Sequence, residues 1–215
     1  MSKNVGVLGS GVVGETLANA FLSLGYAVMR GSRDPSKLDA WRAQSGPQAH
    51  VGSFEATAAF GSVIVLCVRG TAAEAVVRIA AEGLDDKLVL DATNPISEAP
   101  PEQSVLQYFT GPNESLMERL QKLAPKAKFV KAFSSVGAPL MFRPDFSGQK
   151  PTMFICGDDA SARSRATEIL TEFGWETEDL GGAPSARAIE PLAMLWCIPG
   201  MRNNQWSHAF KLLRA

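Results

Sequence analysis

The chain has 215 residues, 46% of them hydrophobic and 20% charged, and its 21 basic and 22 acidic side chains leave a net charge of −1. This composition is that of an ordinary globular protein with enough length to build a hydrophobic core. Because the charge balance is near neutral, it argues against nucleic acid or an anionic membrane surface as a partner.

Neither a membrane segment nor a metal site is indicated. No apolar run reaches the ~18 residues that span a bilayer, and the start of the chain leads into a strand pattern without a signal segment. We therefore expect a cytoplasmic protein. The cysteines Cys67, Cys156 and Cys197 lie far apart, and the histidines His50 and His208 have no neighbour at ligand spacing, so neither a disulfide nor a bound metal is expected.

The first motif with chemical meaning is Gly9-Ser10-Gly11-Val12-Val13-Gly14, which follows the apolar run Val5–Leu8. This spacing predicts a buried strand, a tight turn and a helix whose free N–H groups hold a pyrophosphate. Gly9 permits the turn, Gly11 lets a phosphate approach the backbone, and Gly14 lets the helix pack on the strand. We therefore predict a dinucleotide site that includes Gly9, Ser10, Gly11, Val12 and Val13, with a merely structural glycine turn as the alternative.

The next strand, expected at 26–31, ends in Gly31-Ser32-Arg33. A protein that prefers NAD places a carboxylate there to bind the ribose hydroxyls. A small residue, a hydroxyl and a guanidinium suit a 2′-phosphate instead, which predicts NADP. Alternatively, Arg33 is a solvated loop residue. In either case we expect Asp34 to cap the next helix, with Pro35 at its first position.

The following patterns alternate between strands and helices. We expect strands at 50–52, 62–68, 87–92, 128–133 and 152–156, and helices at 54–60, from Thr71 with Thr71 and Glu74 as capping residues, and from Ser115. Continuous apolar strands are typical of a parallel sheet covered on both faces, and ligands bind at the carboxyl ends of its strands. The residues Val68, Arg69, Asn94, Pro95 and Ala132 lie at or just after the carboxyl ends of three of these strands, so we predict that they line the cofactor crevice. Asn-Pro is also a common turn starter.

Three later segments carry further predictions. The stretch 97–113 is long for a connection, so it is expected to be functional or mobile. Asp158 and Asp159 are expected to cap a helix that runs to about Phe173 rather than to bind a metal. At the C-terminal end we predict a helix over 186–196, a break at 198–200 and a last short helix over 205–213.

Four large apolar residues gather in that last segment: Met194, Trp196, Met201 and Trp206. They suit the wall of a pocket for a flat ring, a dimer contact, or simple core, and core is the commoner role.

With these segments in hand, the chain resembles a small bacterial and archaeal family, the coenzyme F420-dependent NADP reductases. The segments that carry the resemblance are Gly9–Gly14, Gly31–Arg33 with Lys37, Asp91–Pro95, Val130–Phe133, Cys156–Asp159 and Arg187–Pro191. Asp34, the Arg69-Gly70 pair and the tryptophan-rich end depart from it.

The resemblance implies a Rossmann-type, doubly wound, mostly parallel α/β sheet with a small C-terminal helical extension. Residues 1–148 would form the NADP-binding domain, and residues 149–215 a smaller part that completes the cleft. By the same resemblance Ser32, Arg33 and Lys37 contact the 2′-phosphate, and nicotinamide and deazaflavin rings stack in the cleft.

Hydride transfer between stacked rings needs little acid or base help from side chains. The sequence has no Tyr-x-x-x-Lys pair to protonate a ketone, and we expect no catalytic side chain. The first hypothesis is therefore an NADP(H)-dependent oxidoreductase that transfers hydride between NADPH and a flavin-like or deazaflavin acceptor, expected to work as a homodimer. The alternatives are a reductase of a small carbonyl or imine and an NADPH-binding sensor or regulatory module without catalysis.

Overall fold

The computed structural model describes residues 3–215, and its centre is a sheet of six parallel strands. The strands are β1 (Asn4–Leu8), β2 (Ala27–Gly31), β3 (Ala49–Gly52), β4 (Val63–Leu66), β5 (Leu88–Asp91) and β6 (Lys128–Lys131). Their order across the sheet is β3-β2-β1-β4-β5-β6. The order reverses between β1 and β4, the place where sheets of this kind bind ligands. The predicted Rossmann-type sheet is confirmed.

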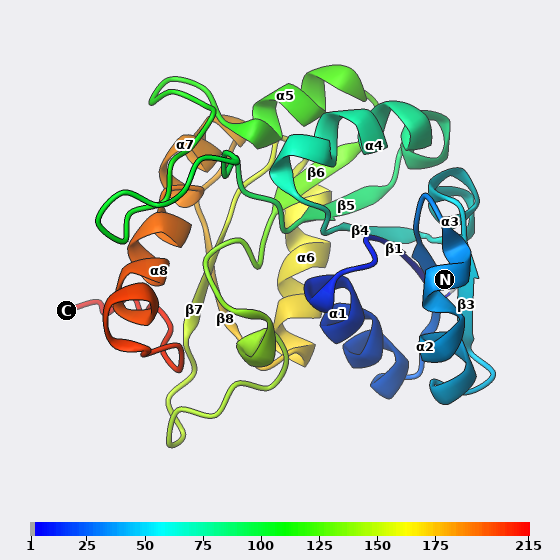
Figure 1. The fold of residues 1–215 in the computed structure, drawn as a ribbon, viewed down its shortest axis with the longest axis horizontal. Helices are drawn as coiled ribbons and strands as arrows, with labels where there is room; N and C mark the ends of the chain where they lie inside the picture. Colours follow the sequence, from blue (N-terminus) through cyan, green and yellow to red (C-terminus); the bar gives the residue numbers. More distant parts are fainter. Residues whose placement is uncertain (1–2) are drawn as a thin grey trace.

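Helices cover both faces of the sheet (Figure 1). One face carries α1 (Val12–Ser23), α2 (Asp39–Gln44) and α6 (Ala160–Glu172), and the other carries α3 (Phe54–Phe60), α4 (Gly70–Leu84) and α5 (Leu116–Leu123). Each face has its own apolar cluster, one around Phe21 and Phe173 and the other around Leu66 and Leu84. Within residues 3–215, no helix combines the length and the apolar composition needed to cross a bilayer.

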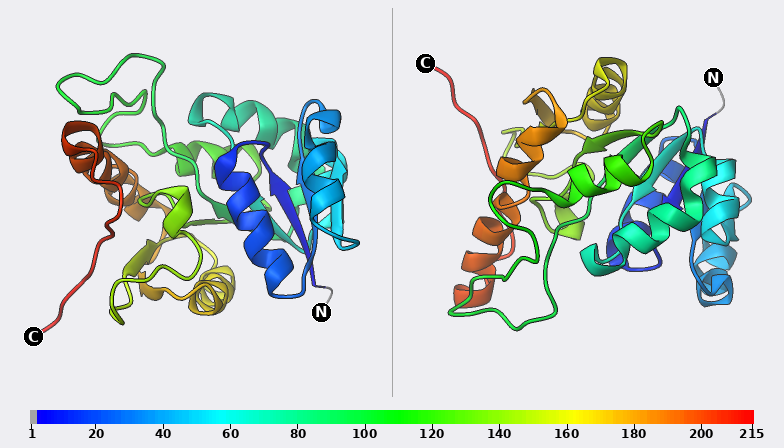
Figure 2. Two further views of the ribbon diagram at one scale, coloured as in Figure 1. Left: turned by 60° about the horizontal axis from the view of Figure 1, so that its bottom comes forward. Right: turned by 90° about the horizontal axis from the view of Figure 1, so that it is seen from above.

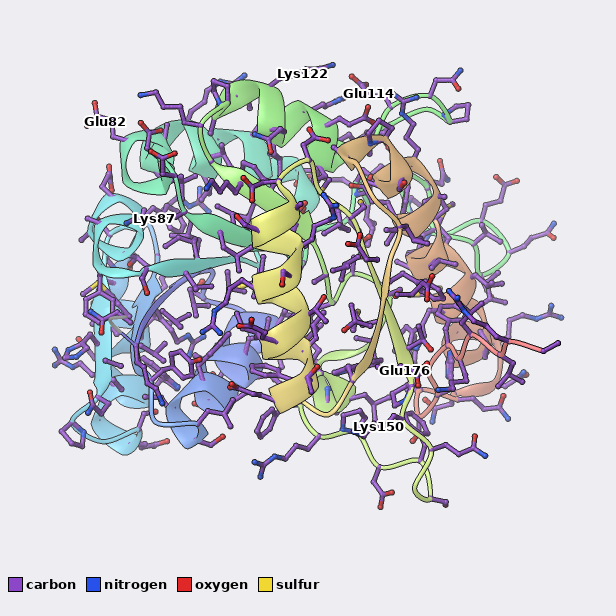
Figure 3. The ribbon with its side chains drawn as sticks, turned by 180° about the vertical axis from the view of Figure 1, so that it is seen from behind. Glu82, Lys87, Glu114, Lys122, Lys150 and Glu176 are labelled. Carbon is purple, nitrogen blue, oxygen red and sulfur yellow. The ribbon has the colours of Figure 1, made fainter. Side chains whose placement is uncertain are left out.

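The C-terminal part adds a second, two-stranded sheet and a helical pair. Strands β7 (Thr152–Ile155) and β8 (Glu176–Asp179) run parallel, and the helices are α7 (Ala186–Ile189) and α8 (Leu192–Asn203). An antiparallel bridge between Lys131 and Cys156 joins this part to the central sheet. Figure 2 shows α7, α8 and the C-terminus at the end of the molecule away from β3. Seen from behind, α6 stands in front of the sheet, and Lys122 and Glu114 project outward at α5 (Figure 3).

The helix predicted from Ser115 and the predicted cap by Asp159 are both present. Ser115 and Glu118 form a reciprocal capping box at the start of α5, and the Asp159 carboxylate accepts the Ala162 N–H at 2.8 Å at the start of α6. Each cap satisfies an N–H group that has no partner inside its helix. Asp158 instead accepts the N–H of Ala183 at 2.8 Å.

The predicted cap of α4 is wrong. The helix begins at Gly70, with Arg69 as the flanking residue and no side-chain cap, so Thr71 and Glu74 lie inside it. Thr71 is the second helical residue and not the N-cap, so its side chain is not placed to cap the helix. The first residue, Gly70, packs directly on the backbone of Asn94, where a Cβ would clash.

The predictions for the C-terminal end are also wrong in their boundaries. The helix breaks at Glu190 rather than at 198–200, and α8 continues through Pro199. Residues 205–213 form no helix. There the backbone bonds to its neighbours: the carbonyl of His208 accepts Trp196 Nε1–H at 2.8 Å, and that of Phe210 accepts the Thr152 N–H at 2.9 Å. These tertiary bonds favour an extended chain over the helix that propensity suggests.

Strand β8 was not predicted. Its sequence, Glu176 to Asp179, consists of three carboxylates and one threonine, so it lacks the apolar pattern that indicates a buried strand. It forms because it pairs in register with β7, Thr152 facing Glu176 and Ile155 facing Asp179.

A buried ion cluster fastens the C-terminal part to the sheet. Lys131 Nζ lies 2.7 Å from Asp91 Oδ2 and 2.9 Å from Glu190 Oε1, and the three side chains are at most 2% exposed. The same Nζ donates to the carbonyl of Thr93 at 2.9 Å. The two carboxylates raise the pKa of Lys131 against the opposing effect of its burial, so the lysine is charged. One ammonium thus ties together β5, β6 and the segment between α7 and α8.

Glu190 extends this cluster to α5. Its carboxylate accepts the N–H groups of Leu116 and Met117 at 2.9 and 3.0 Å, where a helix N-terminus favours negative charge. Nearby, Arg187 bonds both carboxylate oxygens of Glu118, and this hydrogen bonding lowers the pKa of Glu118 to about 2.

We expect Lys131→Met to destabilise the protein by about 3–5 kcal/mol, because it leaves two buried carboxylates without their cation. Lys126→Met is the matched control: it breaks the Lys126–Asp85 pair, 2.9 Å long, in which the lysine is 70% exposed, and should leave the stability nearly unchanged. Urea unfolding measures both. Equal losses in the two variants would contradict the role given to the cluster.

Candidate functional site

A cavity of about 580 Å³ lies at the carboxyl ends of β1, β2 and β4. Its lining residues are Ser10, Gly11, Ser32, Arg33, Asp34, Lys37, Phe54, Cys67, Val68, Arg69, Ala72 and Val76. Seven of them, Ser10, Gly11, Ser32, Arg33, Lys37, Val68 and Arg69, are predicted site residues. The glycine turn and the loop after β2 therefore share one cavity, although about twenty residues separate them in the sequence.

The three glycines of the motif, Gly9, Gly11 and Gly14, have different structural roles. A Cβ on Gly9 would lie 2.7 Å from Cys67 Sγ, and one on Gly14 would lie 2.5 Å from the carbonyl oxygen of Gly9. A Cβ on Gly11 would meet nothing within 4 Å. Packing therefore requires the first and third glycines but not Gly11, and Gly11 leaves open the approach to the N-terminus of α1, where no side chain caps the helix.

Three basic side chains belong to the cavity lining. Arg33, Lys37 and Arg69 line it and are exposed, so their charged groups are free to reorient toward an anion. Ser32 is buried, and its hydroxyl accepts the N–H of Asp34 at 3.1 Å.

Asp34 also lines the cavity, and its predicted cap is wrong in detail. It occupies the N-cap position of the short helix η1 (Pro35–Leu38), with proline in first place as predicted. Its carboxylate, however, accepts the hydroxyl of Ser36 at 2.6 Å and not a backbone N–H. Because η1 is a single 3₁₀ turn, a nearby hydroxyl takes the place of the backbone donor.

An apolar wall completes the cavity, and sequence reasoning missed it. Phe54 comes from α3, and Ala72 and Val76 lie one turn apart on α4. Their spacing of four residues at the start of a helix that follows a sheet strand was an available signal. Cys67 Sγ is also in the lining and donates to the carbonyl of Leu8 at 3.4 Å; burial raises the pKa of its thiol to about 12, so it stays protonated.

The other predicted site residues lie outside this lining. Gly9 is buried in the turn, Val12 is 69% exposed and Val13 half-buried at the start of α1, and Gly31 is buried beside Thr57. Pro95 is buried, and the side chain of Ala132 belongs to the apolar core.

Asn94 and Ser134 bring two unpaired oxygens together after β5 and β6. Asn94 Nδ2 donates to the carbonyl of Ser134 at 2.6 Å, while Asn94 Oδ1 and Ser134 Oγ are buried without a partner among the described residues. Between β6 and Ser134 the chain turns at Phe133, a buried aromatic residue with φ of +62°. Such a backbone costs about 1–3 kcal/mol and is characteristic of ligand sites. Buried, unpaired oxygens of this kind call for a polar ligand group.

An aromatic cluster of the C-terminal part lies near this point. Trp196 packs on Gly137, where a Cβ would lie 2.6 Å from its ring, and stacks on His208 with ring centroids 4.9 Å apart. Trp196 is buried, whereas Trp206 and Met201 are 42% and 37% exposed and Met194 is half-buried. The four large apolar residues therefore divide between core and surface.

Taken together, the residues fit a phosphorylated dinucleotide. The open space at Gly11 leaves the α1 N-terminus accessible to a phosphate, Arg33, Lys37 and Arg69 give the cavity lining positive charge, and the apolar wall can accept a flat ring. The fold and the cavity define a Rossmann-type dinucleotide-binding protein.

Comparison with known proteins identifies the family. Residues 4–95 match the family profile described as NADP oxidoreductase, coenzyme F420-dependent. A crystal structure from Arthrobacter sp. FB24, provisionally assigned as an F420-dependent NADP reductase, is 30% identical with a TM-score of 0.91, and the match covers 100% of both chains. The chain belongs to the coenzyme F420-dependent NADP oxidoreductase family.

More distant relatives are larger proteins. Metalloreductase STEAP3 of Rattus norvegicus is 28% identical over 91% of this chain, and Metalloreductase STEAP2 of Homo sapiens is 26% identical over 88%. The chain spans only 38% and 36% of their lengths. An imine reductase of Streptomyces aurantiacus is 20% identical with a TM-score of 0.66 and is covered over 62% of its length, which shows a shared fold.

We expect Gly11→Ala to leave the melting temperature nearly unchanged, because the added methyl meets no protein atom, but to weaken dinucleotide binding at least about tenfold by blocking the phosphate. Gly14→Ala is the contrasting variant: overpacking against the Gly9 carbonyl should cost about 1–3 kcal/mol of stability. Thermal melts and calorimetric titration with NADPH measure the two effects. Unimpaired binding by the folded Gly11→Ala protein would remove the turn from the site.

Proposed function

We propose that the chain transfers hydride between NADPH and a deazaflavin or flavin-like acceptor, with the dinucleotide seated in the cavity at the glycine turn. One observation carries the proposal: Gly11, which packing does not require, opens onto the same cavity that Arg33 and Lys37 line. A pyrophosphate and a 2′-phosphate need these two features in one place.

In the proposed complex the pyrophosphate lies against the turn formed by Gly9 to Val13. The adenosine ribose lies beside Gly31, at the end of β2. Ser32, Arg33 and Lys37 bind the 2′-phosphate through a hydroxyl and two cations. Phe54, Ala72 and Val76 flank the adenine, and Val68 and Arg69 border the adenosine ribose. This placement is supported because ten of these residues line one cavity: Ser10, Gly11, Ser32, Arg33, Lys37, Phe54, Val68, Arg69, Ala72 and Val76.

The nicotinamide would lie farther along the sheet edge, at Asn94, Pro95 and Ala132. Asn94 Oδ1 and Ser134 Oγ, both buried and unpaired among the described residues, suit the amino and carbonyl groups of a carboxamide. We propose that residues 149–215 form the smaller part that completes the cleft over this end, since Trp196 already packs on Gly137 beside it.

The side chains near this edge suit hydride transfer without acid or base chemistry. Lys131 is held by two carboxylates and the Thr93 carbonyl, and the thiol of Cys67 stays protonated because burial raises its pKa to about 12. Neither is free to take or give a proton. The bound coenzyme supplies the hydride from its nicotinamide ring, and the protein binds, orients and excludes water.

A homodimer is proposed as well. Leu195 and Met201 on α8 are 56% and 37% exposed, and Trp206 just after the helix is 42% exposed. Apolar side chains that cluster on one surface favour a self-complementary contact about a two-fold axis. Light scattering of the purified chain measures its mass in solution and decides the point.

We expect Arg33→Ala to raise the Kd for NADPH about 10- to 100-fold and to leave the Kd for NADH nearly unchanged, because only the 2′-phosphate loses a charge-assisted hydrogen bond. Arg78→Ala, an exposed arginine on α4 outside the cavity, is the matched control. Equal weakening of both coenzymes by Arg33→Ala would rule out a 2′-phosphate contact.

The acceptor is tested directly by mixing the protein with NADPH and, in separate reactions, a deazaflavin, FMN, FAD and a cyclic imine. The proposal expects the NADPH absorbance at about 340 nm to fall with the deazaflavin or a flavin. Turnover only with the imine would instead favour an imine reductase, a class of enzyme with which the chain shares its fold. Tight NADPH binding with no turnover on any acceptor would favour a sensor.

A further inference from the structure

Arg30 is the largest fully buried side chain of the protein among the described residues. It lies in β2, the strand beside β1, and its side chain is 0% exposed. Its guanidinium lies 4.8 Å from the ring centroid of Trp41, whose indole N–H donates to Asn19 of α1 at 2.8 Å. A buried arginine is costly unless its donors are used, so the partners of this one reveal its role.

Those partners are the carbonyls of the glycine turn. Nη2 donates to the carbonyl oxygen of Ser10 at 3.2 Å and to that of Gly11 at 3.3 Å. In a trans peptide the carbonyl and the following N–H point in opposite directions. With the Ser10 and Gly11 carbonyls directed at Arg30, the N–H groups of Gly11 and Val12 are directed away from it, toward the side on which Ser10 and Gly11 line the cavity.

The same contacts make these N–H groups stronger hydrogen-bond donors. A cation that binds a carbonyl oxygen polarises the whole peptide unit, so its N–H becomes a better donor. Arg30 binds the carbonyl oxygens of two peptide units. Their N–H groups are those of Gly11, in the turn, and of Val12, the first residue of α1. Its charge also adds to the positive end of the helix.

Glu15 is a carboxylate that pairs with Arg30, and its negative charge opposes the effect of the guanidinium on the N–H groups. Glu15 Oε2 lies 3.3 Å from Nη1, in the first turn of α1, and its side chain is 54% exposed. Because Glu15 is largely hydrated, it neutralises the buried guanidinium only in part. A negative charge at this place would also repel a bound phosphate.

We propose that Arg30 is a positioning residue for the coenzyme: it aligns and polarises the peptide N–H groups that hold the pyrophosphate, without touching the coenzyme itself. This inference rests on the proposed placement of the dinucleotide. It separates two kinds of arginine in one site, since Arg33 acts on the 2′-phosphate and Arg30 acts on the part that NADPH and NADH share.

The test compares Arg30→Met, Arg30→Lys and Glu15→Gln by calorimetric titration with NADPH, NADH and adenosine 2′-phosphate, which lacks a pyrophosphate. Arg30→Met should raise the Kd for NADPH and for NADH by the same factor, about tenfold or more, and leave that for adenosine 2′-phosphate nearly unchanged. Arg30→Lys should restore part of the loss, because it keeps the charge but not the fork of donors. Glu15→Gln should tighten both coenzymes about twofold.

The opposite signs expected for Arg30 and Glu15 distinguish positioning from simple support of the fold. If the ion pair only held α1 on the sheet, both variants would weaken binding in parallel with a loss of melting temperature, and that result would overturn the inference. So would unchanged binding by a folded Arg30→Met protein. Should Arg30→Met fail to fold, Arg30→Lys and Glu15→Gln decide the question. Failure of the unaltered protein to bind NADPH would instead overturn the proposed function.

Discussion

The structure depends on a single buried ammonium. Lys131 pairs with Asp91 at the end of β5 and with Glu190 beyond α7, and it holds the Thr93 carbonyl in the turn that leads to Asn94. A buried charge of this kind forces its partners into one arrangement, since any other leaves an ion without compensation in a low dielectric. The C-terminal part is therefore fixed on the sheet at the edge where the nicotinamide end of the site is proposed.

A second buried cation acts at the other end of the same edge. Arg30 lies under the glycine turn much as Lys131 lies under the turn at Thr93. In both places a cation within the sheet binds backbone carbonyls on one side of a turn, and the coenzyme is proposed to lie on the other. Both residues belong to strands, which place a side chain more accurately than loops do.

The sequence predicted the parts of the fold and site that depend on local chemistry. The glycine spacing, the end of β2, the helix start at Ser115 and the cap at Asp159 are each set by residues a few positions apart. The segments Asp91–Pro95 and Arg187–Pro191 were recognised only through the family resemblance. The sequence did not predict that Asp91 and Glu190 form a buried ion cluster with Lys131. Partners about 40 and 60 residues apart in the chain leave no periodic signal.

The errors have the same origin. The helix predicted over 205–213 has a reasonable local pattern, but its carbonyls bond to Trp196 and Thr152 instead. Strand β8 carries charge and no apolar pattern and exists because β7 offers a partner. The apolar wall of Phe54, Ala72 and Val76 reads as ordinary core until the fold places it beside the glycine turn.

The extended C-terminal segment also protects the protein. It covers the start of β7, where the Phe210 carbonyl takes the Thr152 N–H and the Leu212 N–H bonds the Thr152 hydroxyl, and Arg214 pairs with Glu178 across β8. An uncovered strand end is a template for pairing with another chain. A protein shortened before Phe210 would keep the cavity at the glycine turn intact and yet become prone to aggregation through the small sheet.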